Sequence, residues 1–448
     1  MDLQESEIWD VIVVGGGPAG MMAAGTAASS AQEKGAKNAA SSTDASAKKP
    51  RVLLIEKNDS LGKKLLITGG GRCNVTNAEL DTRKLLEKYR DNAKFLFSAF
   101  SQWSVAQTLD FFHLRNMATK VEKELRVFPV SDSAQSVWDV LVENLRRHNV
   151  TVLSNSPVIE IVREKLPEGN DVIVGVKLQN KKIVRGRSII IATGGTSRPE
   201  TGSTGDGYGW LEKIGHTVIK PEPSLVPIAL KSGAGEKSEW TKKLAGITLP
   251  NIKLTTFQNG VKQDVAKGKI LFTHVGVSGP TILNMSKDIG ELLKYGDVTI
   301  ALDLLPTEDY GTLNAKLQAL FKEHDKKKFR NALANLVPTA IAGVVTELSG
   351  VNPDTPCNSI TREERLNLVQ LLKAVPMEVS HLLGVEKAII TSGGVSLDEV
   401  DFKTMRSRLF PNLYIIGDML NIDRPSGGYS LQLCWTTGFV AGNAAVEK

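Results

Sequence analysis

Three glycines near the start of the chain have the spacing of a loop that binds a dinucleotide. Gly15, Gly17 and Gly20 form the pattern G-x-G-x-x-G, directly after the apolar run 9–14. In such a loop the first glycine makes a tight turn, the second admits a pyrophosphate, and the third lets helix and strand pack closely. The helix that follows offers free N–H groups to the phosphates. The predicted contacts are Gly15, Gly17, Pro18, Ala19 and Gly20.

A carboxylate ends the next apolar run. Glu56 can accept hydrogen bonds from ribose hydroxyls, and an acidic residue here favours FAD or NAD over NADP. It lies 36 residues beyond Gly20 (56 − 20), more than the usual ~20. We expect the first helix to end near Ser29, and the Ala-, Ser- and Lys-rich segment 31–50 to contain a flexible surface insertion that explains the excess.

Two further motifs, in which a strand leads into glycine, favour FAD over NAD. One is Ala192-Thr-Gly-Gly, and the other is 413–417, which is followed by Asp418. The Asp418 carboxylate could reach ribityl hydroxyls or the pyrophosphate, or it could cap a turn. A simple NAD dehydrogenase has no use for such a C-terminal return strand. The predicted contacts are Ala192, Thr193, Gly194, Gly195, Gly417 and Asp418.

The densest glycine cluster lies in GKKLLITGGGRCNVTN, residues 62–77. Three successive glycines, 69–71, suit a close approach of the backbone to a flavin or pyrophosphate. Arg72 could pair with a phosphate, with a substrate carboxylate or within a structural ion pair. Cys73 has no resolving cysteine nearby, so we expect a buried small hydrophobe beside the flavin. The predicted contacts, with one lysine after Glu56, are Lys57, Lys64, Gly70, Gly71, Arg72, Cys73, Asn74 and Thr76.

A terminal helix is expected to begin near Leu431, after a glycine pair. In two-dinucleotide-fold flavoproteins the N-terminus of such a helix faces the flavin pyrimidine, where the reduced flavin gathers negative charge. The predicted contacts are Gly428, Tyr429, Ser430 and Leu431. His274 is the candidate for acid–base catalysis, because imidazole suits that chemistry near neutral pH. Tyr429 and Arg424 are candidate substrate contacts, and all three could instead be structural.

The elements that must position these residues alternate between strands and helices, and the composition changes after Pro221. The expected strands are 9–14, 51–56, 150–162, 172–178, 182–192, 247–256, 268–273, 297–304 and 412–417. The expected helices are 21–29, parts of 81–120, one capped by Ser131 or Ser133, most of 307–384, and one from about Leu431.

The motifs together resemble those of the HI0933-like flavoproteins, also described as BaiN-like or aminoacetone-oxidase-like. The resemblance rests on 62–77 and on the blocks 126–137, 192–216, 222–228, 270–280, 391–401 and 426–442. The departures are 31–50 and the turn 421–429. The resemblance implies an α/β fold, a two-dinucleotide-binding, glutathione-reductase-like FAD Rossmann domain interrupted by an insert. The implied parts are a flavin domain (1–225 and 386–448), a β-barrel-like domain (226–306) and a mainly helical part (307–385).

Bulk properties exclude several classes of protein. The chain has 448 residues, 41% of them hydrophobic and 23% charged, which is typical of a globular protein of two or three domains. The net charge of +6 (55 − 49) comes without a long basic block, so a nucleic-acid partner is not expected. Three distant cysteines predict neither disulfides nor a metal site and fit a reducing compartment.

The polar start MDLQESE and the lack of an apolar run of ~20 residues predict no signal peptide and no membrane span. We therefore expect a cytoplasmic protein. The sequence leaves its oligomeric state open.

The expected function is that of an FAD-dependent oxidoreductase with hydride transfer through flavin N5. Two redox versions follow from the resemblance: NAD(P)H-linked reduction of a small unsaturated organic substrate, towards which we lean, and oxidation of a small amine, aminoacetone-like, by O₂. The chain has no second G-x-G-x-x-G unit, so NAD(P)H would dock transiently. A flavin-dependent RNA-modifying enzyme and a redox sensor are the alternatives of another class.

Overall fold

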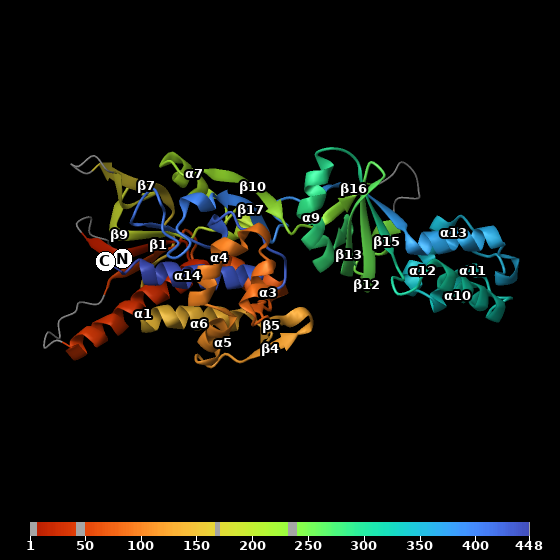
Figure 1. The fold of residues 1–448 in the computed structure, drawn as a ribbon, viewed down its shortest axis with the longest axis horizontal. Helices are drawn as coiled ribbons and strands as arrows, with labels where there is room; N and C mark the ends of the chain where they lie inside the picture. The colour runs from red at the N-terminus through yellow and green to blue at the C-terminus, as the bar shows by residue number, and fades with distance from the viewer. Residues whose placement is uncertain (1–6, 42–49, 166–170, 232–239, 448) are drawn as a thin grey trace. The chain divides into compact units, whose positions relative to one another are not determined.

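The computed structural model describes residues 7–41, 50–165, 171–231 and 240–447, with the backbone alone for 30–41. The chain divides into two compact units (Figure 1), the first formed by Met1–Pro223 with Ile389–Lys448 and the second by Ser224–Ala388. The expected boundaries differ by two residues (225 − 223) and by three (389 − 386). Both ends of the chain therefore build the first unit.

A parallel sheet forms the centre of the first unit. Its strands are β6 (Thr151–Leu153), β2 (Val52–Ile55), β1 (Ile8–Val14), β9 (Ile183–Ile191) and β18 (Leu413–Ile415), in that order. The register sets Val14 of β1 beside Ile191 of β9, and Ile415 of β18 beside the same residue. The loops after these three strands therefore begin at one edge of the sheet, where α/β folds bind their ligands.

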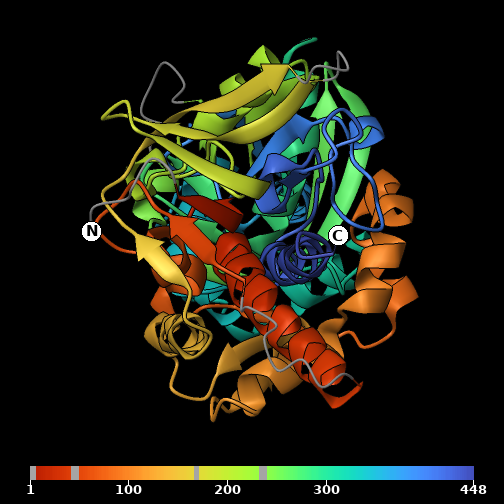
Figure 2. The ribbon, with the colours of Figure 1, turned by 90° about the vertical axis from the view of Figure 1, so that its left-hand side faces the viewer.

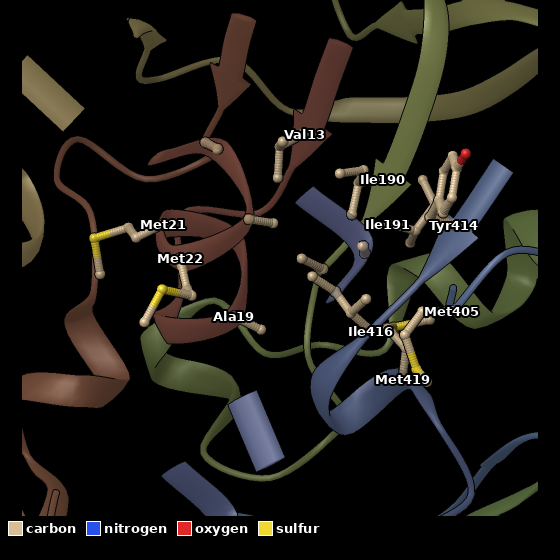
Figure 3. Packing of buried hydrophobic residues seen from close by; sticks show 14 of the residues in the cluster. Val13, Ala19, Met21, Met22, Ile190, Ile191, Met405, Tyr414, Ile416 and Met419 are labelled. Carbon is tan, nitrogen blue, oxygen red and sulfur yellow. The ribbon is translucent and has the colours of Figure 1, made fainter. Parts of the chain in front are cut away.

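Strand β9 also belongs to an antiparallel meander. Its first residues, Ile183–Arg185, pair with β8 (Asp171–Leu178), which pairs with β7 (Val158–Lys165). Its last three residues are fully buried in the parallel part of the sheet. The buried apolar run expected at 188–191 thus enters the interior of the unit, beside Val13 and Ile416 (Figure 3).

Two helices from opposite ends of the chain pack directly against each other. They are α1 (Pro18–Ser41) and α14 (Tyr429–Ala444), seen side by side in Figure 2. A Cβ on Gly438 would lie 2.6 Å from the Ala19 carbonyl oxygen, and one on Gly442 would lie 2.5 Å from that of Ala23. Glycine is required at both positions because the two backbones touch.

The first helix is longer than predicted. It was expected to end near Ser29, but α1 continues to Ser41, so residues 31–41 are helical rather than a flexible insertion. The segment is rich in Ala, Lys, Glu and Gln, which are strong helix formers. The rest of the predicted insertion, residues 42–49, lies outside the described residues.

The remaining elements of the first unit surround this core. Helix α6 (Ala134–Arg147) is capped by Ser133, one of the two caps expected. Short elements α2 (Lys63–Leu66) and η1 (Thr68–Gly71) precede a three-stranded sheet β3-β5-β4. The other bounds are β3 (Thr76–Asn77), α3 (Thr82–Glu87), α4 (Ala93–Gln102), α5 (Val105–His113), β4 (Thr119–Glu122), β5 (Arg126–Pro129), α7 (Asp206–Lys213), β10 (Val218–Ser224) and β17 (Ile390–Val395).

The second unit is a closed barrel followed by helices. The barrel order is β11 (Ile228–Leu230), β14 (Gly276–Ser278), β13 (Val261–Phe272), β12 (Thr248–Gln258), β15 (Val298–Asp303) and β16 (Val375–Leu382). The helices of the unit are α8 (Trp240–Lys243), α9 (Pro280–Leu293), α10 (Tyr310–Glu323), α11 (Phe329–Ala332), α12 (Thr339–Ser349) and α13 (Arg362–Lys373).

Strand β16 lies at the C-terminal end of the stretch 307–384, which was expected to be mainly helical. Val375, Met377 and Val379 are buried while the residues between them are exposed, which is the period of two of a strand. The strand closes the barrel by pairing with both β15 and β11. Because α13 ends at Lys373, only one residue separates helix from strand. Among the described helices, none has the length and apolar composition needed to cross a bilayer.

Candidate functional site

A large cavity opens in the first unit where β1, β9 and β18 end. Its empty space, with the open mouth included, is about 1170 Å³. Its lining comes from the first unit alone. The predicted residues in that lining are Gly15, Gly17, Pro18, Ala19, Glu56, Lys57, Lys64, Ala192, Thr193, Gly194, Gly417, Asp418, Ser430 and Leu431.

The glycine loop after β1 has the geometry that a pyrophosphate requires. Gly15 has φ of 107°, and a Cβ there would lie 2.4 Å from the Ala192 carbonyl oxygen. A Cβ on Gly20 would lie 1.9 Å from the Gly15 carbonyl oxygen, so this glycine packs helix α1 against the turn. A Cβ on Gly17 would meet no atom within 4 Å. Gly17 therefore leaves its backbone open to a ligand, beside the unpaired N–H groups of the first helical turn.

Glu56 is held rigidly at the end of β2. It is buried, and its two carboxylate oxygens accept hydrogen bonds from the backbone N–H groups of Gly16 and Asn58, both at 2.8 Å. An ionised carboxylate has about four acceptor sites, so capacity remains for ribose hydroxyls. The carboxylate and the glycine loop fit the ribose and the pyrophosphate of one dinucleotide.

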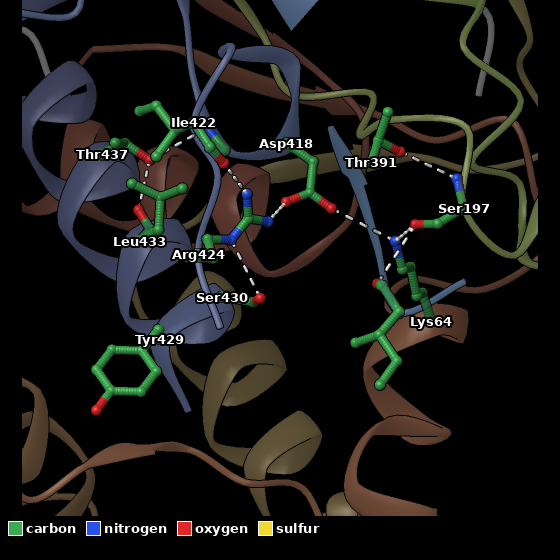
Figure 4. Close-up of polar contacts among 12 residues, drawn as sticks. Lys64, Ser197, Thr391, Asp418, Ile422, Arg424, Tyr429, Ser430, Leu433 and Thr437 are labelled. Carbon is green, nitrogen blue, oxygen red and sulfur yellow. Dashed lines mark hydrogen bonds and ion pairs between the residues drawn. The ribbon is translucent and has the colours of Figure 1, made fainter. Parts of the chain in front are cut away.

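Asp418 lies on the cavity wall within a buried charge network (Figure 4). Its carboxylate accepts from the Arg424 guanidinium and from Lys64 Nζ, the latter at 3.4 Å. Burial would raise the pKa of Asp418, but the positive charges of Arg424 and Lys64 outweigh it, and the pKa is lowered. Asp418 is therefore ionised, and its position is fixed by two cations.

Arg424 is a structural member of this network. Its side chain is fully buried and also donates to the Ile422 carbonyl oxygen at 2.7 Å and to Ser430 Oγ at 3.1 Å. It does not line the cavity. Arg424 thus ties Asp418 to the first turn of α14, which is a positioning role rather than the predicted substrate contact.

Three lysines line the cavity, of which Lys63 pairs with Asp59 while Lys57 and Lys64 contact other residues of the site. Lys64 Nζ lies 2.5 Å from Ser197 Oγ. Lys57 Nζ lies 2.8 Å from Asp206 Oδ2 and 2.5 Å from Thr204 Oγ1. Lys57 and Lys64 add positive charge there for an anionic ligand.

The N-terminus of α14 is the second helix end at the cavity. Its N-cap, Gly428, has φ of 103° and supplies no side-chain cap. A Cβ on Gly428 would lie 2.3 Å from the Thr76 backbone, so this glycine lets the helix start against β3. Ser430 and Leu431 in the first turn line the cavity. Their end of the helix carries the positive pole of the helix dipole.

Several predicted residues do not line the cavity. Gly195 packs against Thr391, since a Cβ there would lie 2.1 Å from Thr391 Oγ1. Thr76 Oγ1 lies 2.6 Å from Gln432 Oε1 in the interior. The predicted contacts and catalytic candidates outside the lining are Gly20, Gly70, Gly71, Arg72, Cys73, Asn74, Thr76, Gly195, His274, Arg424, Gly428 and Tyr429.

The segment after η1 is held by structural contacts. Arg72 pairs with Glu122 and Asp132 and lies over the Phe128 ring, 4.1 Å from its centroid. This is the structural ion pair among the three roles considered. Cys73 is fully buried, and burial raises the pKa of its thiol to about 12.

The two remaining catalytic candidates, Tyr429 and His274, do not line the cavity. The carbonyl oxygen of Tyr429 accepts a hydrogen bond from the Tyr89 hydroxyl at 2.8 Å, and the Tyr429 ring packs edge-on against that of Tyr89. His274 is exposed in the turn between β13 and β14, within the second unit. Tyr429 is therefore not part of the cavity lining, and His274 belongs to the other unit.

The cavity includes residues that the sequence reasoning missed. They include Gly202, Ser203, Thr204 and Asp206 of the run 202–206, together with Asn58 and Cys434. The run 202–206 combines glycines, hydroxyls and a carboxylate before a helix, which is a local signal for a ligand loop. Burial also raises the pKa of the Cys434 thiol to about 12.

Comparisons with known proteins agree with this geometry. Residues 34–444 match the family described as the HI0933-like protein Rossmann domain. A protein of Escherichia coli (strain K12) named ribosomal RNA dihydrouridine synthase is 30% identical over 392 residues, which cover 87% of this chain and 90% of that protein. A 3-dehydro-bile acid delta(4,6)-reductase of Clostridium scindens is 27% identical over 399 residues, with 89% and 93% covered.

Solved structures share the fold. An open-conformation flavocytochrome c3 fumarate reductase superposes with a TM-score of 0.51 at 16% identity, covering 98% of this chain and 78% of that chain. A 3-ketosteroid delta1-dehydrogenase from Sterolibacterium denitrificans gives 0.51 at 13% identity, covering 98% and 100%. The predicted α/β Rossmann fold is confirmed, and the insert contains the closed barrel.

Proposed function

Because the chain belongs to the HI0933-like family and is an FAD-dependent oxidoreductase, we propose that it reduces a carbon–carbon double bond conjugated to a carbonyl group, with NADH or NADPH as the electron source. The names of the two relatives share this chemistry. Dihydrouridine is uridine in which the double bond conjugated with a carbonyl group has been reduced. A 3-dehydro delta(4,6) compound has double bonds conjugated with a 3-oxo group.

The observation that carries the proposal is the meeting of two helix N-termini in one cavity. The first turn of α1 would hold the pyrophosphate of FAD, and Glu56 would hold its ribose. Ser430 and Leu431, at the start of α14, would face the flavin ring and stabilise the negative charge of its reduced form. Bound FAD supplies hydride acceptance and hydride donation at N5.

The overall reaction balances as a two-electron reduction. The nicotinamide donor loses a hydride, and the double bond gains that hydride at one carbon and a proton at the other. The sequence has one G-x-G-x-x-G unit, which supports transient docking of the nicotinamide. Asp418 and Lys64, fixed beside Ser197, keep the cavity wall charged and ordered during both half-reactions.

A small molecule is the proposed acceptor. The net charge is only +6, and no long basic block stands out in the sequence. The test is an anaerobic experiment in which the FAD-loaded enzyme is reduced with NADH or NADPH and then mixed with acceptors. One arm contains a cyclic enone and a 3-oxo-4,6-diene steroid, each paired with its saturated analogue. The other arm contains unmodified ribosomal RNA.

The expected result is rapid loss of the oxidised flavin absorbance with one nicotinamide, and its return only with conjugated acceptors. Return with RNA alone would make RNA the substrate class. If neither nicotinamide reduces the flavin but a small amine does, and O₂ reoxidises it, the enzyme is an oxidase and the proposal is wrong.

A further inference from the structure

A second cavity lies in the first unit, on the surface formed by α1, α5, α6 and α14. Its empty space is about 650 Å³ with the open mouth included. Its walls include Met22, Thr26, Trp103, Phe111, Arg115 and Phe439. It shares no residue with the cofactor cavity.

Arg115 is the one cation in the described lining of this cavity, Asp110 is the one carboxylate there, and no ion pair joins the two. The Arg115 guanidinium donates to Asn144 Oδ1 from Nε at 3.2 Å and from Nη2 at 2.9 Å, and to the Phe111 carbonyl oxygen at 3.0 Å. Among the residues that the structure describes, no carboxylate lies within ion-pair distance of it. Partial burial, with the charge of Arg147, lowers the pKa of Arg115. The cation is thus held by neutral groups alone.

The position of Asn144 depends on a glycine inside α1. A Cβ on Gly25 would lie 2.3 Å from Asn144 Nδ2, and Asn144 is buried at 4% exposure. Glycine inside a helix is destabilising relative to alanine. Helix α1 thus contains a destabilising glycine at the point where Asn144 packs against it. The group that accepts the hydrogen bonds of Arg115 there is the neutral amide of Asn144 rather than a carboxylate. The positive charge remains available to a ligand.

Aromatic rings form the wall beside this charge. The rings of Trp103 and Phe439 lie 4.2 Å apart between centroids, and those of Trp103 and Phe111 lie 6.0 Å apart. Trp103 is fixed because its Nε1 donates to Thr108 Oγ1 at 2.9 Å. Phe111 also faces the guanidinium, 3.9 Å from the ring centroid. An apolar body would find flat partners here, next to one cation.

We propose that this second cavity binds a small amphipathic anion, with an apolar ring body against Trp103 and Phe439 and a carboxylate or sulfonate on Arg115. The ligand would supply the anionic partner that Arg115 lacks among the described residues, although the Asp110 carboxylate lines the same cavity. Guanidinium pairs well with such groups because it presents parallel N–H donors. The assignment does not depend on the substrate of the cofactor cavity.

The test uses the FAD-loaded enzyme and the fluorescent probe 1-anilinonaphthalene-8-sulfonate, with the uncharged N-phenyl-1-naphthylamine as its matched control. Binding is followed by probe fluorescence and by energy transfer from tryptophan. The variants are Arg115→Gln, Asn144→Asp, which places a carboxylate beside the guanidinium, and Trp103→Phe. Arg147→Gln is the control variant, because Arg147 pairs with Glu143 and does not line the cavity.

We expect the sulfonate probe to bind the wild type and the Arg147→Gln variant equally, and to bind Arg115→Gln and Asn144→Asp at least about tenfold more weakly. Trp103→Phe should remove most of the energy transfer. Bound flavin and the unfolding midpoint report that each variant is folded, and if Arg115→Gln does not fold, Asn144→Asp carries the test. Equal binding of the two probes, or unchanged binding in the folded variants, would overturn the proposal.

Discussion

Two glycine-rich segments of this chain look alike in sequence and differ in what they do. The loop 15–20 holds four glycines and the run 69–71 holds three, and both contain residues with positive φ. In the first, added Cβ atoms would strike the backbone 2.4 and 1.9 Å away. In the second, Gly70 and Gly71 have open space around them and lie outside the cofactor cavity. A cluster of glycines therefore indicates only an unusual backbone conformation. The cluster forms part of the cofactor cavity here where it directly follows a strand of the parallel sheet.

The largest effect is expected in the first loop. Gly20→Val would force the Cβ against the Gly15 carbonyl oxygen and separate α1 from the turn. We expect the variant to lose its FAD on gel filtration, measured as flavin per protein. Gly209→Ala in α7 is the control, because a Cβ there would meet no atom within 4 Å. Full retention of FAD by Gly20→Val would remove the basis for the comparison.

A second test uses the thiols, one from each region. Burial raises the pKa of Cys73, beside the second glycine run, and of Cys434, in the cavity, to about 12. A free cysteine has a pKa near ~8.5, so at pH 8 their thiolate fractions should be lower by roughly 10³. We expect iodoacetamide to leave both unlabelled in the folded enzyme and to label both in urea, as mass spectrometry of peptides would show. Labelling of folded Cys73 would contradict its structural role.

A third test compares the charges of the two regions. Asp418→Asn would leave Arg424 buried without its carboxylate, at a cost of about 3–5 kcal/mol in the free energy of unfolding. Asp132→Asn, at the exposed pair with Arg72, should change little. Urea unfolding measures both variants. An equal effect of the two substitutions would mean that the cavity network adds no stability.

The Asp418 contribution should also depend on pH. Its pKa is lowered in the folded state, so the stability is present above the ordinary value of ~3.9 and is lost as pH falls through the folded value. The difference between wild type and Asp418→Asn should therefore narrow in acid.

The smallest effect is expected for Gly70→Ala. The φ of 69° strains an alanine, but no atom lies near the added Cβ. The variant should lose about 1 kcal/mol of stability in urea and keep its FAD. Loss of FAD would show that the second run contacts the cofactor, as the sequence alone suggested.

The parts of the site that could be predicted depend on local patterns. A strand followed by glycine identified the loops at Gly15, Ala192 and Gly417, and Glu56 follows directly from the second strand. The roles of Arg72 to Thr76 could not be read in this way. They depend on β4 and β5, whose carboxylates and aromatic ring take up the Arg72 side chain.

Two features of the fold were hidden for a similar reason. The full length of α1 could not be predicted, because the Ala- and Lys-rich composition of residues 31–41 is common to linkers and to helices. Strand β16 begins so soon after α13 that the sequence pattern of the helical stretch was extended over it. Its pairing with β15 and β11 identifies it as a strand. The residues that line the second cavity also come from segments far apart in sequence, so no local pattern could predict them.

The packing of α14 on α1 constrains how the protein is made. During translation β1 and α1 leave the ribosome first, while β18 and α14 leave last. Until then β9 keeps an open edge, and Ala19 and Ala23 lack the glycine helix that covers them. Residues 224–388 have their own core and emerge in the interval. Until β18 and α14 are made, the cofactor cavity lacks the part of its wall that Gly417, Asp418, Ser430 and Leu431 supply.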